Sequence, residues 1–138
     1  RRSGADVTRV RKMFREDAND YRAKADAVSQ AKIYMDEYAI SVCTSEGVSS
    51  PTVVGAQAAN ELLNIVGIKA SFVLTDYQGK IYVSARSIDA VNVQIIMERL
   101  GGGGHMSIAA CQMEGTSLAE AIGTLKDTID IMLEEGDI

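Results

Sequence analysis

The segment that decides the fold runs from residue 68 to residue 86. It reads Ile68-Lys-Ala-Ser-Phe-Val-Leu-Thr75, then Asp76-Tyr-Gln-Gly79, then Lys80-Ile-Tyr-Val-Ser-Ala-Arg86. The outer two pieces are rich in β-branched and aromatic residues, which favour strands. The middle piece is typical of a turn because it combines Asp and Gly. The segment therefore predicts two strands joined by a turn that leads the chain back.

Helical patterns lie on both sides of these strands. Before them, Ser50 is placed to cap a helix from Pro51 to Val66, and Gly67 is placed to stop it. After them, the segment from Val91 to Leu100 fits a short helix that ends at a run of four glycines. Helices and strands that alternate in this way indicate a mixed sheet covered by helices.

The remaining segments complete an expected set of five helices and five strands. The capping box of Ser117 and Glu120 predicts the start of the last helix. The other expected elements are strands over Ala31–Met35, Tyr38–Cys43 and Ala109–Glu114, and helices over Ser3–Arg15 and Asn19–Gln30. The predicted fold class is α/β, with a mixed central sheet of about five strands flanked by helices. It forms a single compact domain preceded by a linker helix.

Composition excludes several classes of protein. The chain has 138 residues, 46% apolar residues, one histidine and two cysteines. This apolar content is too high for disorder, and the apolar runs are too short to span a membrane. Two cysteines do not make a disulfide framework, and one histidine argues against a zinc site. We expect a domain in a reducing cytosol, cut from something longer because the chain opens on Arg1 without an initiator Met.

The charge is distributed unevenly along the chain. Residues 1–24 hold eight Lys or Arg against four acids, whereas residues 25–138 hold six against fifteen. An acidic body does not attract polyanions at long range, so a broad nucleic-acid face is not expected. A local phosphate pocket is compatible with this charge. The basic N-terminal segment reads either as a solvated helix face or as a surface that faces another domain or an anionic ligand.

The glycine run Gly101-Gly-Gly-Gly-His105 is the least ordinary feature of the sequence. Ordering glycine costs roughly 0.5–1 kcal/mol per residue relative to alanine, so something must compensate. One interpretation is a backbone that approaches an anion closely, with the amides of Gly102, Gly103 and Gly104 pointing at it and His105 at the rim. The other interpretation is a flexible linker between two packing units.

A second cluster of polar residues lies just upstream, where a predicted strand ends. Ser84 and Ser87 flank Arg86, and arginine is suited to bidentate recognition of phosphate or carboxylate. The alternative is a surface arginine paired with one of the many acids. Asn92 is placed to cap the next helix, or to reach a ligand at the start of that helix.

These features together resemble a known family. The residues that carry the resemblance keep their order and spacing along the chain: Ser84-x-Arg86-Ser87, Val91-Asn92, Gly101-Gly-Gly-Gly-His105 and Ala109-Ala110. The pattern resembles the DHH-associated C-terminal domain, which follows the DHH catalytic domain in RecJ-like exonucleases, nano-RNases and cyclic-dinucleotide phosphodiesterases. Cys111 departs from many relatives, which have glycine after the double alanine, and this weakens the likeness to the nuclease branch.

Other segments make the likeness most specific to the membrane-anchored cyclic-di-AMP phosphodiesterases that also carry a degenerate GGDEF module. These segments are Ser3-Gly-Ala-Asp-Val7, Arg11-Lys-Met-Phe14, Ala31-Lys-Ile-Tyr34 and Tyr38-Ala-Ile-Ser-Val42. The resemblance implies that residues 1–30 are a linker region after a DHH domain. It implies that residues 31–138 are the DHH-associated substrate-binding domain.

The resemblance also implies that catalysis and substrate binding lie in different domains. The family's DHH domain holds two manganese ions, and its Asp-His-His motif is absent from this chain, so we expect no catalytic residue, no metal and no cofactor here. The isolated chain is predicted to be inactive. The substrate-binding residues implied are Ser84, Arg86, Ser87, Asn92, Gly101, Gly102, Gly103, Gly104 and His105.

Several functional alternatives stay open at this point. The first is the substrate-binding half of a cyclic-di-AMP phosphodiesterase, cytoplasmic but anchored to the membrane through the full-length protein. The second is the same half of a RecJ-like or nano-RNase-type oligonucleotide exonuclease, and the third is a non-catalytic nucleotide-binding or dimerisation module. The expected partners are a cyclic dinucleotide or short oligonucleotide and a DHH domain in cis, with a homodimer left open and no membrane contact by this domain. Tyr77 and Tyr82 are expected to pair across strands, with stacking on adenine as the alternative.

Overall fold

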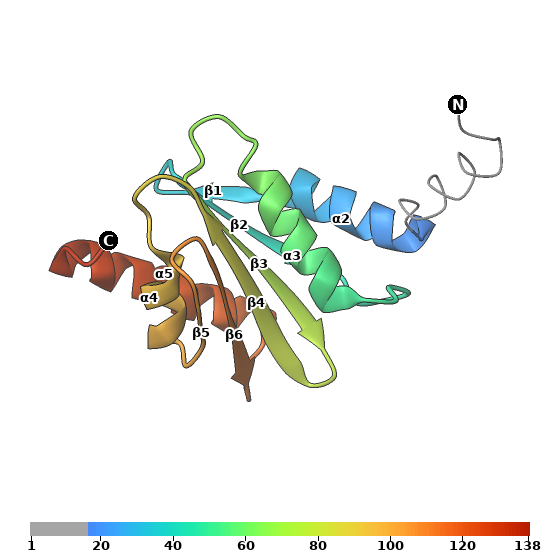
Figure 1. The fold of residues 1–138 in the computed structure, drawn as a ribbon. Helices are drawn as coiled ribbons and strands as arrows, with labels where there is room; N and C mark the ends of the chain where they lie inside the picture. Colours follow the sequence, from blue (N-terminus) through green and yellow to red (C-terminus); the bar gives the residue numbers. More distant parts are fainter. Residues whose placement is uncertain (1–16) are drawn as a thin grey trace, which may run out of the picture.

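The computed structural model describes residues 17–138, which form one mixed sheet with helices on both faces (Figure 1). The helix expected from Ser3 to Arg15 lies outside these residues, as does most of the basic N-terminal segment. Along the chain the elements are α2 (Ala18–Gln30), β1 (Lys32–Tyr34), β2 (Tyr38–Cys43), α3 (Pro51–Leu62), β3 (Ala70–Tyr77), β4 (Lys80–Ser87), α4 (Val93–Arg99), β5 (Gly103–Gly104), β6 (Ile108–Glu114) and α5 (Leu118–Glu135).

The sheet has six strands in the order β1-β2-β3-β4-β6-β5. Only β2 and β3 are parallel among these strands, and α3 connects them, while the other neighbours are antiparallel. The predicted mixed sheet and the predicted reversal at residues 76–79 are thereby confirmed. The β3–β4 hairpin turns at Gln78 and Gly79, which both adopt positive φ, 52° and 78°. A turn of this kind matches the right-handed twist of its strands.

Two apolar cores lie on opposite faces of the sheet. The larger core packs α4 and α5 against β2, β3, β4 and β6, with Phe72, Leu125 and Ile129 fully buried. The smaller core packs α2 and α3 on the other face, and its strand residues come only from β2 and β3. Ala23 and Ala27 of α2 belong to this smaller core, so the segment after residue 17 packs into the domain.

Three local expectations are wrong. A sixth strand, β5, forms from two glycines that disfavour strands, because β6 supplies the pairing partner. Helix α3 ends at Leu62 and not at Val66, which is fully exposed, because the chain must turn back for Ile68 to enter the smaller core. Ser50 holds the N-cap position of α3, but its side chain makes no capping hydrogen bond.

The capping box that predicted the last helix is confirmed and gives a first testable effect. The Ser117 hydroxyl accepts a hydrogen bond from the Glu120 amide at 3.1 Å, and the Glu120 carboxylate accepts one from the Ser117 amide at 3.2 Å. Ser117→Ala should lower the free energy of unfolding by about 1 kcal/mol. Urea denaturation measures this, with Thr116→Ala as the neighbouring control that leaves the box intact. Equal stability of the two variants would contradict the capping role.

Candidate functional site

On the face of the sheet that carries α2 and α3, β6 and part of β4 are left open by the helices. Side chains alternate along β4, so Ile81, Val83 and Ala85 enter the larger core while Tyr82, Ser84 and Arg86 point to the other face. In the smaller core on that face, the strand residues that pack against α2 and α3 come only from β2 and β3. Tyr82, Ser84 and Arg86 are therefore only half-buried, and the facing positions of β6 are exposed.

Small residues form a row across the middle of this open face. Ser84 of β4 lies opposite Ala110 of β6, and Ala110 lies opposite Gly103 of β5. Directly opposed residues in antiparallel strands share a face, so these three positions form a flat floor. Arg86 and its partner Ile108 stand in the row on one side of this floor, and Tyr82 and Gln112 stand in the row on the other.

Arg86 has no acidic partner among residues 17–138. Its Nη1 donates a hydrogen bond to the Ala85 carbonyl at 2.9 Å, and its Nε is buried without any partner. Burial lowers the pKa of this guanidinium from its ordinary value, although arginine stays charged at neutral pH. A desolvated cation with a free donor in an acidic protein favours recognition of an anion over the surface ion pair that the sequence left open.

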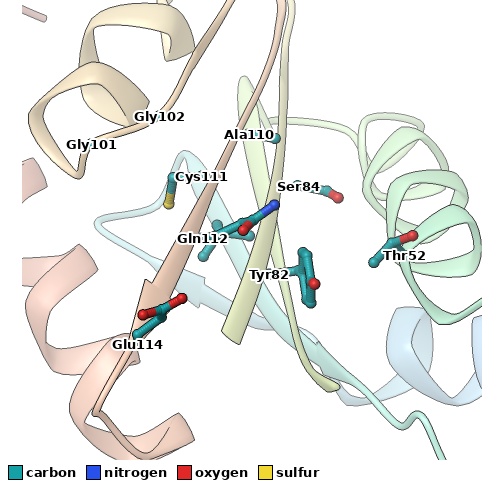
Figure 2. A pocket seen from close by; sticks show the side chains of 10 residues that line it. Thr52, Tyr82, Ser84, Gly101, Gly102, Ala110, Cys111, Gln112 and Glu114 are labelled. Carbon is teal, nitrogen blue, oxygen red and sulfur yellow. The ribbon is translucent and has the colours of Figure 1, made fainter. Parts of the chain in front are cut away.

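A pocket of about 460 Å³ opens beside this floor, between the glycine run and α3 (Figure 2). This volume is in the range of small-molecule sites. The residues that line it are Thr52, Tyr82, Val83, Ser84, Gly101, Gly102, Ala110, Cys111, Gln112 and Glu114. Of the predicted site residues, the pocket contains Ser84, Gly101 and Gly102, while Arg86 lies one row of the sheet beyond Ser84.

The first half of the glycine run ends α4 in a Schellman motif. The Gly101 amide donates to the Glu98 carbonyl at 3.0 Å, and the Gly102 amide donates to the Met97 carbonyl at 2.8 Å. Gly101 has a φ of +87°, which favours glycine. The Gly102 amide, expected from the sequence to face an anion, is therefore engaged within the helix end.

The second half of the run is the edge strand β5, so the flexible-linker interpretation is wrong. Gly103 and Gly104 pair with Ala110 and Ala109 of β6. His105 follows directly; its side chain is exposed and its amide donates to the Ile108 carbonyl at 2.7 Å. Gly104 is needed here because a Cβ would lie 2.5 Å from the Ile108 carbonyl oxygen of β6, a reason that the sequence alone did not suggest.

Ser87 and Asn92 are held in structural contacts. Ser87 is buried on the face opposite Arg86, and its hydroxyl donates to the Val91 carbonyl at 2.7 Å. Asn92 is the N-cap of α4, and its Oδ1 accepts from the amides of Gln94 and Ile95. The structure thus brings Ser84, Arg86 and Gly103 to one face but does not bring Ser87 to it. A ligand contact by Ser87 or Asn92 stays a prediction.

Besides Tyr82, six residues that line the pocket were not predicted as site residues: Thr52, Val83, Ala110, Cys111, Gln112 and Glu114. Tyr82 was weighed, and its expected pairing with Tyr77 is confirmed by ring centroids 6.3 Å apart at a tilt of 48°. The period-two alternation over residues 80–86 already places Tyr82 on the face of Ser84 and Arg86. Nothing comparable in the sequence signals Thr52, which reaches the pocket only because α3 packs beside β4.

Both cysteines are free and buried. Burial raises the pKa of the Cys111 thiol to about 11, so only about one thiol in a thousand is ionised at pH 8. The native chain should therefore resist a thiol-directed reagent at pH 8 and react fully in denaturant. The time course of labelling under both conditions measures this, and fast labelling of Cys111 in the native chain would contradict its burial.

No three His, Cys, Asp or Glu side chains within residues 17–138 gather closely enough to hold a metal ion. None of the helices described is long and apolar enough to cross a bilayer.

Comparisons with known proteins agree with this architecture. The chain is 41% identical over 128 residues to the cyclic-di-AMP phosphodiesterase PdeA of Listeria monocytogenes, covering 92% of this chain and 19% of PdeA. It is 40% identical over 138 residues to the cyclic-di-AMP phosphodiesterase GdpP of Bacillus subtilis, covering 99% of this chain and 21% of GdpP. The chain thus spans about a fifth of the length of these curated relatives.

A solved structure and a family model add to these relatives. The crystal structure of an exopolyphosphatase-related protein from Bacteroides fragilis shares the fold, with a TM-score of 0.76 at 20% identity over 95% of this chain and 39% of that one. The DHHA1 domain model matches residues 36–134, which is most of the chain. Because this model matches more than half of the chain, and relatives about 40% identical align over nearly all of it, the chain belongs to the DHHA1 domain family.

Proposed function

We propose that this chain is the substrate-binding domain of a DHH-family phosphodiesterase that hydrolyses cyclic di-AMP to the linear dinucleotide. The observation that carries the proposal is Arg86, a half-buried guanidinium without an acidic partner among the described residues, beside a floor of small side chains. About 40% identity to proteins named cyclic-di-AMP phosphodiesterases supports the choice of substrate.

The open face suits an elongated anion. The floor of Ser84, Ala110 and Gly103 carries little side-chain bulk, so a sugar-phosphate backbone has room to lie close to the strands. Arg86 presents a guanidinium fork to a phosphate oxygen at one end of this floor. The Ser84 hydroxyl on the floor supplies a further donor. These residues orient the substrate and neutralise its charge, which is how a non-catalytic domain contributes to rate.

The chemistry itself is assigned to a DHH domain outside these residues. Hydrolysis with two metal ions needs several Asp and His ligands around the metals, and residues 17–138 hold no such cluster. The manganese ions would be held in the DHH domain and activate water there. We expect the purified 138-residue chain to hydrolyse nothing in the presence of manganese, and measurable activity would contradict this assignment.

The proposal extends to the whole protein that carries this domain. We infer a signalling enzyme anchored in the membrane, with this domain on the cytoplasmic side and the DHH domain in cis. The similarity to PdeA and GdpP covers nearly all of this chain but only about a fifth of each relative, which leaves most of each relative for further domains.

Calorimetric titration of the chain tests the proposal directly. Cyclic di-AMP should bind to the wild-type chain and lose at least tenfold in affinity with Arg86→Met, because the phosphate loses its guanidinium. A short oligoribonucleotide is the comparison ligand. Tighter binding of the oligonucleotide would favour a nano-RNase-type exonuclease instead. Equal affinity of the wild type and Arg86→Met for cyclic di-AMP would contradict the proposed contact between Arg86 and the phosphate.

A further inference from the structure

We propose that Tyr82 and Gln112 form a nucleobase subsite that selects adenine over guanine. This inference rests on the proposed function, since it assumes a nucleotide with its phosphate at Arg86. It goes beyond that function by naming the side chains that distinguish the bases.

The two residues stand opposite each other on the open face. Tyr82 of β4 and Gln112 of β6 are directly opposed in the register, and both line the 460 Å³ pocket. Figure 2 shows the Tyr82 ring between Gln112 on one side and Thr52 of α3 on the other. An aromatic face, an amide and a hydroxyl thus border one cavity, which is a combination typical of base-binding sites.

The subsite lies at a suitable distance from the phosphate-binding residue. Tyr82 and Arg86 are four residues apart on the same face of β4, which corresponds to roughly 13 Å between their Cα atoms. Both side chains are long and extend from the same face, so a nucleotide can lie over Ser84 between them. Its phosphate then meets Arg86 and its base meets Tyr82.

The Gln112 amide supplies the selectivity. Its side chain is exposed and engages in no hydrogen bond within residues 17–138, so its Oε1 acceptor and Nε2 donor are both available. Adenine presents an N6 donor beside an N7 acceptor, which a glutamine amide pairs at both atoms. Guanine presents two acceptors, at O6 and N7. The Oε1 acceptor of Gln112 would therefore face another acceptor and make no hydrogen bond there.

Neighbouring groups hold the stacking ring and moderate the charge of the pocket. The Tyr77 ring packs against Tyr82 at 6.3 Å between centroids and restricts its motion. Glu114, the acid in the pocket lining, pairs with Lys80 at 3.3 Å. Its charge is therefore partly balanced and does not by itself repel an anionic nucleotide.

The test compares adenine and guanine substrates in a full-length phosphodiesterase that carries this chain. The ratio of kcat/KM for cyclic di-AMP to kcat/KM for cyclic di-GMP is measured for wild type, Gln112→Met and Tyr82→Ala. Gln57→Met is the matched control, because Gln57 is an exposed glutamine of α3 outside the pocket lining. Gln112→Met should lower the ratio at least about fivefold, whereas Gln57→Met should leave it unchanged.

The variants separate the subsite from the proposed function. Tyr82→Ala should lower kcat/KM for both substrates by similar factors, since stacking does not depend on which purine is bound. An unchanged ratio in Gln112→Met would overturn the subsite. If the ratio is unchanged while Arg86→Met still lowers kcat/KM at least tenfold, only the subsite fails. If Arg86→Met has no effect either, the proposed function fails with it.

Discussion

Arg86→Met should lower kcat/KM for cyclic di-AMP at least tenfold in a full-length phosphodiesterase that carries this chain. Removing one partner of a buried, charge-assisted contact typically costs about 2–5 kcal/mol. Met fills a similar volume without the guanidinium, so the change removes the charge and leaves the packing. The measurement is steady-state kinetics together with thermal unfolding of the same variant.

The expected stability of this variant makes the prediction sharper. Because the Nε of Arg86 is buried without a partner, its replacement by Met should leave the free energy of unfolding unchanged or raise it by about 1 kcal/mol. Loss of activity would then not be explained by loss of fold. Arg99→Met is the matched control, since Arg99 pairs with Glu135 at 2.7 Å and Asp137 at 2.9 Å, outside the site. Wild-type kinetics in Arg86→Met would refute the role of Arg86.

Gly102→Ala should destabilise the domain by about 3 kcal/mol, at the upper end of the usual effect of overpacking. A Cβ at this position would clash with the carbonyl oxygen of Ala110 and lie 2.6 Å from the Cβ of Cys111. Both obstacles belong to the middle of β6, which lies between β4 and β5, and neither is the end of a flexible side chain. Denaturant unfolding measured by circular dichroism tests this expectation.

Gly103→Ala is the control within the same run. A Cβ there meets nothing within 4 Å, and its φ is not positive, so its stability should stay within about 0.5 kcal/mol of wild type. The added methyl group would stand in the row of Ala110 and Ser84, so this variant should fold normally and still weaken binding of cyclic di-AMP. Equal destabilisation by both alanines would show that the run needs glycine for a reason other than contact with β6.

Local signals predicted the elements whose formation depends on neighbouring residues. The capping box placed the start of α5 at the correct residue, and the turn residues 76–79 placed the β3–β4 hairpin. Period-two alternation along residues 80–86 is reproduced in the burial of β4. These features depend on hydrogen bonds and side-chain contacts within a few residues, so the local pattern is sufficient to predict them.

The candidate site was predicted only in part. Ser84, Arg86 and the glycine run were identified, but Ser87 faces away from Arg86, because adjacent residues of a strand point to opposite faces. The glycine run was interpreted as an anion-binding backbone. In the structure its first two amides form hydrogen bonds at the end of α4, and its last two residues pair with β6. That pairing joins residues that the sequence pattern alone does not bring together.

By itself the sequence determined the family, the helix and strand segments and the presence of an arginine and a glycine run suited to a phosphate. The tertiary structure alone decided that one face of β6 and part of β4 is uncovered, because the core that α2 and α3 build on that face draws strand residues only from β2 and β3. It also decided that Thr52, Tyr82 and Gln112 share one pocket. The physical reason is that exposure of a sheet face depends on which helices pack over it, and that packing joins segments too far apart in the chain for a local pattern to specify.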